Sequence, residues 1–264
     1  MMLSPASSTS LLHQDAIDHD FSERVRNMFN ARAENWNRKY LPRGKLAWRL
    51  DAFCETLREC VQPPKEVLDF GCGTGHLAAH LYGHRYRVTG CDFAENMIAL
   101  ARENFGESAI TWVELPTRWS RLPFADNAFD AVVASSVFEY LADIHLVLGE
   151  LARVLKHKGV LIFNVPNPES FRRRRESWSL QVTKQDWIRS AICTIPRVRR
   201  YFTYLDLSTN RYGLNQWEWS TQLHGFKRIR KLLQRQDQRP LFMLAFRKTI
   251  LWSVDAPSSL YQEP

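Results

Sequence analysis

The sequence has little of several features that define whole classes of protein. Its 264 residues include only five cysteines, an odd number with no Cys-x-x-Cys pair, so we predict neither a disulfide framework nor a metal site of the zinc type. A reducing, cytoplasmic setting fits this cysteine usage best. No apolar run approaches the ~20 residues that a membrane-spanning helix needs. Residues 1–20 lack the basic start and long apolar core of a signal peptide and are expected to form a disordered tail.

Strand and helix patterns alternate along the middle of the chain. Five short apolar runs are predicted to be strands, at 66–70, 86–92, 110–115, 129–135 and 159–166. Amphipathic segments predicted to be helices lie before and between them, at 21–40, 45–60, 76–82, 94–104 and 141–159. Continuous apolar strands between amphipathic helices predict an α/β fold, a doubly wound and mostly parallel sheet with helices on both faces.

One domain is expected over residues 21–254, followed by a frayed tail at 255–264. The alternation breaks at about 167–224, which we interpret as a helical insertion that forms a lid. Within it, residues 183–195 are expected to form a helix that Pro196 ends. After it, two strand-like runs joined by a short polar turn predict a terminal hairpin.

Glycine is scarce, with 11 in the whole chain, yet three stand within five positions of the stretch VLDFGCGTGHLA at 67–78. Gly71 would permit a tight turn, Gly73 would let the backbone approach a ligand, and Gly75 would let helix and strand pack closely. Asp92 ends the next strand, where an acid accepts hydrogen bonds from ribose hydroxyls. The pattern predicts a cofactor that contains a nucleoside.

Two classes of cofactor use such a loop. A dinucleotide site reads G-x-G-x-x-G, because its pyrophosphate rests on the helix N-terminus; here the last of those positions is His76, and the glycines run G-x-G-x-G. S-adenosylmethionine has no phosphate but carries an ammonium group. Asp69, at the start of the loop, suits that group. The sequence therefore favours S-adenosylmethionine.

Four stretches in order resemble the class I S-adenosylmethionine-dependent methyltransferases. They read EVLDFGCGTGHLA, VTGCDFAENMIALAREN, LPFADNAFDAVVASSVFEYL and ELARVLKHKGVLIFNVPNP, and they cover about residues 66–168. The subgroup that the chain most resembles is methyltransferase type 11, which contains the ubiquinone-type O- and C-methyltransferases. The resemblance implies a Rossmann-like sheet of seven strands with an antiparallel last strand, and an enzyme that uses S-adenosylmethionine.

The resemblance also implies which residues bind the cofactor. They are grouped by the part of the cofactor that they would meet: the methionine end by Arg49, Asp69, Gly71 and Gly73, the ribose by Asp92, the adenine by Phe93, and the sulfonium by Ser135 and Ser136.

Two positions depart from the family pattern. Relatives often carry an acid after the third strand that touches the adenine amino group; this chain has none there, so Trp119 or the main chain would take its place. Relatives also often read Glu-His-Leu where this chain reads Glu139, Tyr140 and Leu141, so a histidine acting as base or metal ligand has no counterpart. The catalytic residues stay unknown, with Glu139, Tyr140 and His145 as the candidates for a general base.

Positive charge is concentrated in one segment. Residues 171–201 hold nine basic and two acidic side chains and so account for +7 of the formal net charge of +8. Such a concentration indicates an acidic partner. Three partners stay open, in this order: an acidic small-molecule or lipid-like substrate, the surface of an anionic membrane, and RNA, which comes last because no RNA-binding module accompanies the charges.

The sequence thus predicts methyl transfer from S-adenosylmethionine to an acidic small-molecule or lipid-like acceptor. The alternatives are an RNA methyltransferase and a non-catalytic protein that binds S-adenosylmethionine and regulates another. No nucleic acid and no transmembrane segment are expected, and peripheral contact with an anionic membrane stays open.

Overall fold

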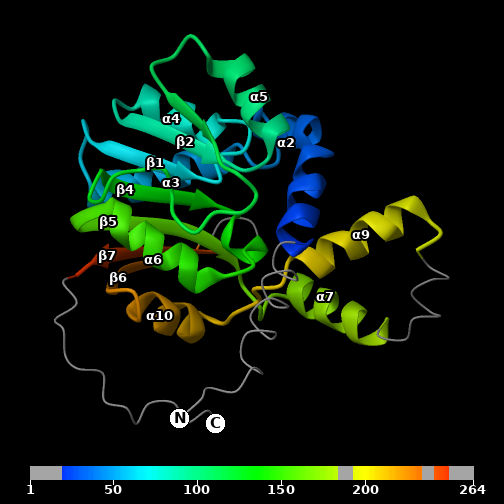
Figure 1. The fold of residues 1–264 in the computed structure, drawn as a ribbon. Helices are drawn as coiled ribbons and strands as arrows, with labels where there is room; N and C mark the ends of the chain where they lie inside the picture. Colours follow the sequence, from blue (N-terminus) through cyan, green and yellow to red (C-terminus); the bar gives the residue numbers. More distant parts are fainter. Residues whose placement is uncertain (1–19, 184–192, 234–240, 250–264) are drawn as a thin grey trace, which may run out of the picture.

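A computed structural model describes residues 20–183, 193–233 and 241–249, and its centre is one sheet of seven strands (Figure 1). The order across the sheet is β3-β2-β1-β4-β5-β7-β6. The strands are β1 Glu66–Phe70, β2 Arg87–Asp92, β3 Thr111–Glu114, β4 Phe129–Ser135, β5 Leu155–Pro166, β6 Phe226–Leu233 and β7 Leu241–Lys248. Strands β1 to β5 pair in parallel, and β7 runs antiparallel to both of its neighbours. The predicted Rossmann-like sheet with an antiparallel last strand is confirmed.

Helices cover both faces of this sheet. Residues 20–30 are helical, and the further helices are α2 Ala33–Tyr40, α3 Trp48–Cys60, α4 His76–Gly83, α5 Glu95–Phe105, the short 3-10 helix η1 Phe138–Tyr140, α6 Ile144–Val154, α7 Phe171–Val182, α9 Pro196–Leu207 and α10 Leu214–Gln222. Helices α3 and α4 pack on one face, and α6 and α10 pack on the other. The layers are therefore those of a doubly wound fold.

Strand β1 shows why the strands read as continuous apolar runs. Val67 joins the core on the side of α3 and α4, and Leu68 joins the core on the side of α6 and α10. Both side chains are fully buried, because successive residues of a strand point to opposite faces and both faces are covered.

One predicted helix is shorter than expected. Helix α6 begins at Ile144, where the Asp143 carboxylate accepts hydrogen bonds from the N–H groups of His145 and Leu146. It ends at Val154, since Leu155 is already extended (φ −75°, ψ 136°) and pairs with Phe129 of β4. The residues after Leu155, assigned to the helix from the sequence, belong to β5.

The chain between β5 and β6 contains α7, α9 and α10. Figure 1 shows α7 and α9 side by side, projecting away from the sheet, whereas α10 lies along it. Pro196 begins α9 instead of ending a helix, because proline lacks an N–H and its fixed φ suits the first helical turn. The helix expected over 183–195 falls largely at 184–192, outside the described residues. Within the described ranges, no helix has both the length and the apolar character to cross a membrane.

Candidate functional site

The glycine-rich loop joins the end of β1 to the start of α4. Gly71, Gly73 and Gly75 all have positive φ, at +70°, +54° and +82°. A Cβ on Gly71 would lie 2.4 Å from Val137, and one on Gly75 would lie 2.7 Å from Trp112, so packing alone requires glycine at both positions. A Cβ on Gly73 would meet nothing closer than 3.8 Å. Gly73 therefore leaves a space open in front of the loop.

That space is a cavity of about 70 Å³ at the carboxyl ends of the central strands. Strand β1 lies between β2 and β4, at the point where the chain order reverses, which is where open α/β sheets bind ligands. The lining comes from the loop, the ends of β2 and β4 and the N-terminal helices: Phe29, Trp36, Gly71, Gly73, Asp92, Phe93, Met97, Ser135, Ser136, Val137, Tyr140 and Leu141. Six of the eight residues expected to bind the cofactor line this one cavity.

Asp92 holds the loop in place. One carboxylate oxygen accepts the Gly73 N–H at 2.9 Å, and the other accepts the Ala94 N–H at 2.9 Å. Burial raises the pKa of Asp92, although the N–H groups of Ala94, Gly73 and Phe93 act in the opposite direction. Asp92 thus fixes the backbone that a ligand would touch and also faces the cavity.

Asp69 lies beneath the loop and does not line the cavity. It is 1% exposed, and within the described chain neither carboxylate oxygen has a hydrogen bond of ordinary geometry. Burial and, second, the charge of Asp92 raise its pKa to about 8, while the Ala78 N–H acts in the opposite direction. A buried carboxylate without a partner is stabilised by a nearby cation. Asp69 lies below the loop, and the space at Gly73 lies in front of it. Together they fit a cofactor with an ammonium group.

Arg49 does not line the small cavity but contacts Ser136, which does. The Arg49 guanidinium donates to the Ser136 hydroxyl at 2.6 Å. Ser136 itself has φ +59°, and its N–H donates to the Asn164 side chain at 2.7 Å. The neighbouring Ser135 hydroxyl is buried and makes no hydrogen bond to any residue that the structure describes. Helix α3 thus brings its arginine to the end of β4, as the resemblance implies.

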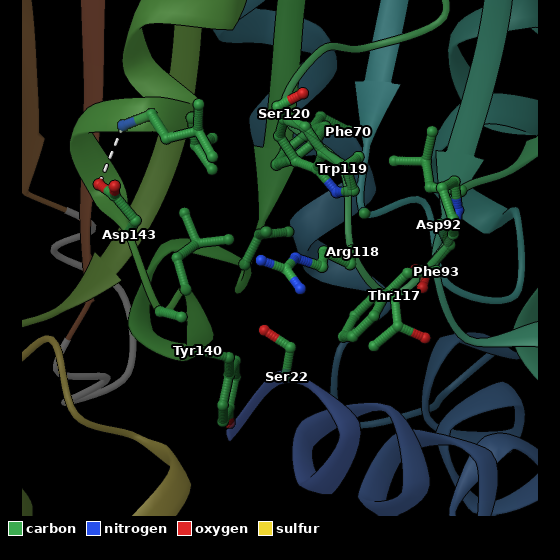
Figure 2. A pocket seen from close by; sticks show the side chains of 18 of the residues that line it. Ser22, Phe70, Asp92, Phe93, Thr117, Arg118, Trp119, Ser120, Tyr140 and Asp143 are labelled. Atoms are coloured by element: carbon green, nitrogen blue, oxygen red, sulfur yellow. Dashed lines mark hydrogen bonds between the residues drawn. The ribbon is translucent and has the colours of Figure 1, made fainter. Parts of the chain in front are cut away.

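A second cavity, of about 850 Å³, opens on the other side of Asp92 and Phe93 (Figure 2). Trp119 lies in its wall and contacts Phe70 edge to face, with ring centroids 6.2 Å apart. Figure 2 shows Trp119, Phe93 and Arg118 around the same space. Trp119, which the sequence offers together with the main chain in place of the missing acid, thus lies in the wall of a cavity that Asp92 and Phe93 also line.

A third cavity, of about 710 Å³, shares Phe29, Trp36, Ser136 and Tyr140 with the small one. Seven basic residues line it: Arg32, Lys39, Lys45, Arg49, Arg173, Arg197 and Arg200. Glu139 is the single acid among its lining residues. The cavity wall is therefore strongly positive beside the cofactor pocket.

Glu139 is held inside a buried ion-pair network. Its carboxylate accepts hydrogen bonds from Arg173 and, at 2.8 Å, from the Ser208 hydroxyl. Arg173 also pairs with Glu176 at 2.8 Å, and both carboxylates are almost fully buried. Glu139 is therefore paired with Arg173 inside the protein.

The other two candidate bases differ in position. Tyr140 lines all three cavities, and its ring contacts Phe29 edge to face at 5.1 Å. Burial and, second, the Glu139 carboxylate raise the pKa of Tyr140 well above its usual value. His145 lies at the start of α6 with its Nδ1 3.1 Å from His224 Nε2, and it lines none of the three cavities. The structure thus brings Glu139 and Tyr140 to the site and leaves His145 outside it.

Sequence reasoning missed the cations that the N-terminal segment contributes. Arg32 and Lys39 are seven residues apart, so two helical turns place them on the same side of the segment. Arg32 also donates to the Arg200 carbonyl at 3.1 Å, which joins the N-terminal segment to α9 across the cavity. The seven-residue spacing could have indicated that Arg32 and Lys39 share one side of the segment. Nothing local in the sequence indicates that this side faces α9.

Comparison with known sequences matches residues 68–163 to the family described as "Methyltransferase domain". A 2-phytyl-1,4-naphtoquinone methyltransferase of Trichormus variabilis is 32% identical over 182 residues, which are 62% of this chain and 73% of that protein. A malonyl-[acyl-carrier protein] O-methyltransferase of Legionella pneumophila is 28% identical over 60% of this chain and 55% of its own length. The ubiquinone/menaquinone biosynthesis C-methyltransferase UbiE of Desulfotalea psychrophila is 41% identical, over 36% of this chain and 38% of its own length. The chain thus spans about half or less of the length of the last two relatives.

Among solved structures, magnesium protoporphyrin IX methyltransferase from Synechocystis PCC 6803 with bound S-adenosylhomocysteine superimposes with a TM-score of 0.63. The match covers 85% of this chain and 98% of that one, at 16% identity, and so shows a shared fold. The family match, the relative that is 32% identical over most of its length, and the glycine loop with its acids all agree. The chain belongs to the class I S-adenosylmethionine-dependent methyltransferases, and S-adenosylmethionine is its cofactor.

Proposed function

We propose that the protein transfers a methyl group from S-adenosylmethionine to an acidic small-molecule or lipid-like acceptor bound in the 710 Å³ cavity. The observation that carries this proposal is the charge of the cavity wall, with seven basic residues, of which five remain once Arg173 is paired with Glu139 and Arg49 is assigned to the cofactor. Clefts lined by one sign of charge concentrate ligands of the opposite sign. An anionic acceptor would therefore be drawn to this wall.

The residues around the small cavity would hold the cofactor. Asp92 would accept the ribose hydroxyls, Arg49 would bind the carboxylate of the methionine end, and Asp69 would ionise beside the ammonium group, which favours the charged form of the carboxylate. Phe93 and Trp119 would pack on the adenine. When bound, S-adenosylmethionine supplies the methyl group and, in its sulfonium, the leaving group.

The two cavities meet where methyl transfer would take place. Phe29, Trp36, Ser136 and Tyr140 line both the cofactor pocket and the basic cavity. An in-line displacement at carbon mainly requires that the protein aligns the acceptor and excludes water. The three aromatic rings at the junction suit both tasks, because they are bulky and apolar.

The candidate bases favour an acceptor that is already ionised. Glu139 accepts hydrogen bonds from Arg173 and Ser208, and the raised pKa of Tyr140 keeps its proton in place at neutral pH. A carboxylate needs no base, since its pKa lies near 4. In the step that we propose, the acceptor oxygen forms the new C–O bond as the S–C bond breaks, and no proton leaves. One relative is named an O-methyltransferase of malonyl-acyl-carrier protein, which agrees with an oxygen acceptor.

Transfer of labelled methyl groups tests this function. The purified protein and methyl-labelled S-adenosylmethionine are incubated with small-molecule, lipid and RNA fractions of a cell extract. We expect label in the anionic small-molecule or lipid fraction, released by mild base as from a methyl ester. Label that ribonuclease removes would favour the RNA methyltransferase, and binding of the cofactor without transfer to any fraction would favour the non-catalytic alternative.

Variants of α9 test the location of the acceptor. Replacing Arg197 and Arg200 together by Gln should raise the acceptor KM and leave the affinity for S-adenosylmethionine unchanged, because neither residue lines the cofactor pocket. Arg199→Gln is the matched control, since it lies on the same helix and does not line the cavity. Equal KM values in all three proteins would contradict the assignment of this cavity to the acceptor.

Peripheral contact with an anionic membrane is a second candidate property, favoured by exposed apolar side chains on the projecting helices. Phe171 is 77% exposed and Trp178 is 65% exposed on α7, while Ile195 is 55% exposed at the start of α9. Aromatic residues beside arginines are typical of segments that lie at a lipid surface. Vesicles with and without anionic lipid distinguish the outcomes: Trp178→Ser should weaken binding to anionic vesicles, and absence of wild-type binding would remove this candidate.

A further inference from the structure

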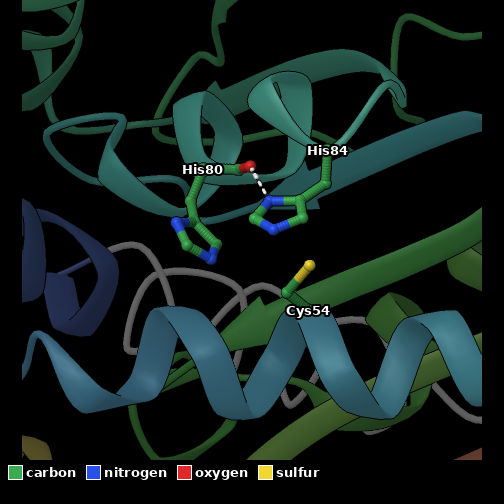
Figure 3. Close-up of side chains that lie close together, drawn as sticks. All are labelled: Cys54, His80 and His84. Atoms are coloured by element: carbon green, nitrogen blue, oxygen red, sulfur yellow. Dashed lines mark hydrogen bonds between the residues drawn. The ribbon is translucent and has the colours of Figure 1, made fainter.

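We propose that α3 and α4 carry a binding site for Zn²⁺ or a similar divalent transition-metal ion, with Cys54, His80 and His84 as ligands (Figure 3) and with Asp51, which lies beside His80, as the fourth. The site lies away from the three cavities, and it does not depend on the proposed function. The sequence predicted no metal site, because the chain has no Cys-x-x-Cys pair and the four ligands come from two separate helices.

The ligand atoms already lie close together. The Cys54 sulfur and one ring nitrogen from each of His80 and His84 all lie within 4.8 Å of one another. In a tetrahedral zinc site, with Zn–N near 2.1 Å and Zn–S near 2.3 Å, neighbouring ligand atoms are about 3.5 Å apart. Closing the remaining distance takes movements of about 1 Å at the ends of side chains. Figure 3 shows the three side chains in the same space between the two helices.

The spacing on each helix explains the convergence. Asp51 and Cys54 are three residues apart on α3, and His80 and His84 are four apart at the C-terminal end of α4. Both spacings place side chains on one face of a helix. The Asp51 carboxylate lies 3.3 Å from His80 Nε2. Asp51 is not among the three groups whose ligand atoms converge, so its exposed side chain would turn toward them to act as the fourth ligand.

Both histidines are prepared for a metal. His84 Nδ1 lies 2.8 Å from the His80 carbonyl oxygen. A carbonyl only accepts, so Nδ1 carries the proton and Nε2 is left with its lone pair, which is the second-shell arrangement of metal-bound histidine. His80 Nε2 is buried and makes no hydrogen bond of ordinary geometry within the described chain.

The donor set selects the class of metal. One sulfur, two imidazole nitrogens and one carboxylate suit Zn²⁺, whereas Mg²⁺ and Ca²⁺ take oxygen ligands. Cys54 is 3% exposed, and burial raises the pKa of its thiol, although Arg58 acts in the opposite direction. Binding would therefore release the thiol proton to solvent as the metal–sulfur bond forms. Four protein ligands far from the cavities indicate a structural site, not a catalytic one.

The consequence concerns the two helices that reach the cofactor pocket. Helix α3 carries Arg49 in its first turn, and α4 begins directly after Gly75. A metal bound between these helices would cross-link the supports of Arg49 and of the glycine loop. We therefore expect the ion to raise the thermal stability of the full chain.

Metal titration of the full-length protein, after treatment with a chelator, tests the site. Calorimetry with Zn²⁺ should give one ion per chain, and Co²⁺ should give a thiolate-to-cobalt charge-transfer band. Cys54→Ser should abolish that band, and His84→Gln should weaken Zn²⁺ binding by more than the about 10–100-fold that loss of an outer partner costs. Cys60→Ser and His157→Gln are matched controls outside the cluster, and both should bind as the wild type does.

Two results would overturn the proposal. One is absence of Zn²⁺ binding by the wild type. The other is unchanged Zn²⁺ binding by His84→Gln. This variant should fold, because the His84 side chain is only partly buried, and circular dichroism would verify its folding. Asp51→Asn separates the fourth ligand from the rest: we expect weaker binding with the cobalt–thiolate band retained, and unchanged affinity would remove Asp51 from the site.

Discussion

Replacing Asp69 by Asn should stabilise the cofactor-free protein at pH 8, although it removes a charge from the cofactor site. The carboxylate is 1% exposed, and burial and then the charge of Asp92 raise its pKa to about 8 against the Ala78 N–H. In the unfolded chain the pKa of this group is about 3.9. Between about pH 4 and pH 8 the folded protein therefore keeps a proton that the unfolded chain loses.

The sign and size of the effect follow from this difference in pKa. The folded state binds more protons, so the free energy of unfolding falls as the pH rises from about 4 to about 8. A shift of about four units, at 1.36 kcal/mol per unit, makes that loss about 5 kcal/mol. Asn cannot ionise and escapes the loss, while its buried amide without partners costs roughly 1–3 kcal/mol. The net gain expected for Asp69→Asn at pH 8 is about 2–4 kcal/mol, and near pH 4 it becomes a loss of roughly 1–3 kcal/mol, because only the cost of the buried amide remains.

Urea denaturation of both proteins at several pH values between about 5 and 8 measures this gain. Asp130→Asn is a control of opposite sign: burial of Asp130 is outweighed by Lys156 and by the Glu66 N–H, so its pKa is lowered. A lowered pKa adds stability that is present above the unfolded pKa, and Asp130→Asn should lose it at pH 8.

The cofactor should reverse the order of the two proteins. Saturating S-adenosylhomocysteine should stabilise the wild type more than Asp69→Asn, because the ammonium group of the ligand favours the ionised carboxylate. The free energy of unfolding of Asp69→Asn, relative to the wild type, should rise from pH 5 to pH 8. If it does not, ionisation of the buried carboxylate does not destabilise the folded wild type, and the reasoning fails.

Three further substitutions probe the site. Gly73→Ala should fold, because the nearest atom to the added Cβ is 3.8 Å away. Calorimetry should show weaker cofactor binding, since the methyl group enters the cavity at a strained φ of +54°. Wild-type affinity would contradict the contact between Gly73 and the cofactor. Arg49→Gln should weaken cofactor binding by about tenfold or more through loss of a charged hydrogen bond, and unchanged affinity would exclude Arg49 from the site. Glu139→Gln should lower the free energy of unfolding by up to about 3–5 kcal/mol, because Arg173 stays buried with less compensation; a loss below about 1 kcal/mol in urea denaturation would contradict that.

The central strands and the glycine loop could be predicted because their signals are local. Strands covered on both faces read as continuous apolar runs, as at Val67 and Leu68, whatever the rest of the chain does. The loop could be predicted because three glycines stand within five positions, and all three adopt the positive φ that glycine favours. The boundary of α6 could not, since Leu155 suits a helix and a strand equally, and its pairing with β4 decides between them.

The position of Asp69 shows a limit of assignment by resemblance. The motif places an acid at the start of the loop, and the structure has it there, but beneath the loop and outside the lining of the pocket. Sequence gives the residue type and the spacing, whereas burial decides whether the group acts by contact or through its charge. Its raised pKa follows from burial, and nothing in the sequence reports that burial.

The charge of the 710 Å³ cavity shows how one expectation, an acidic acceptor, can rest on different residues in the sequence and in the structure. The sequence located positive charge in the run at 171–201, yet Arg173 of that run is neutralised by Glu139 and Glu176 inside the protein. Arg32 and Lys45, far from the run, line the cavity instead, and they meet Arg197 and Arg200 only because the N-terminal segment packs against α9. A count along the chain cannot separate a buried, paired arginine from one that faces a cavity. The preference for an acidic acceptor therefore rests on the lining of the cavity, and substitution of Arg173 should affect stability where substitution of Arg197 and Arg200 affects KM.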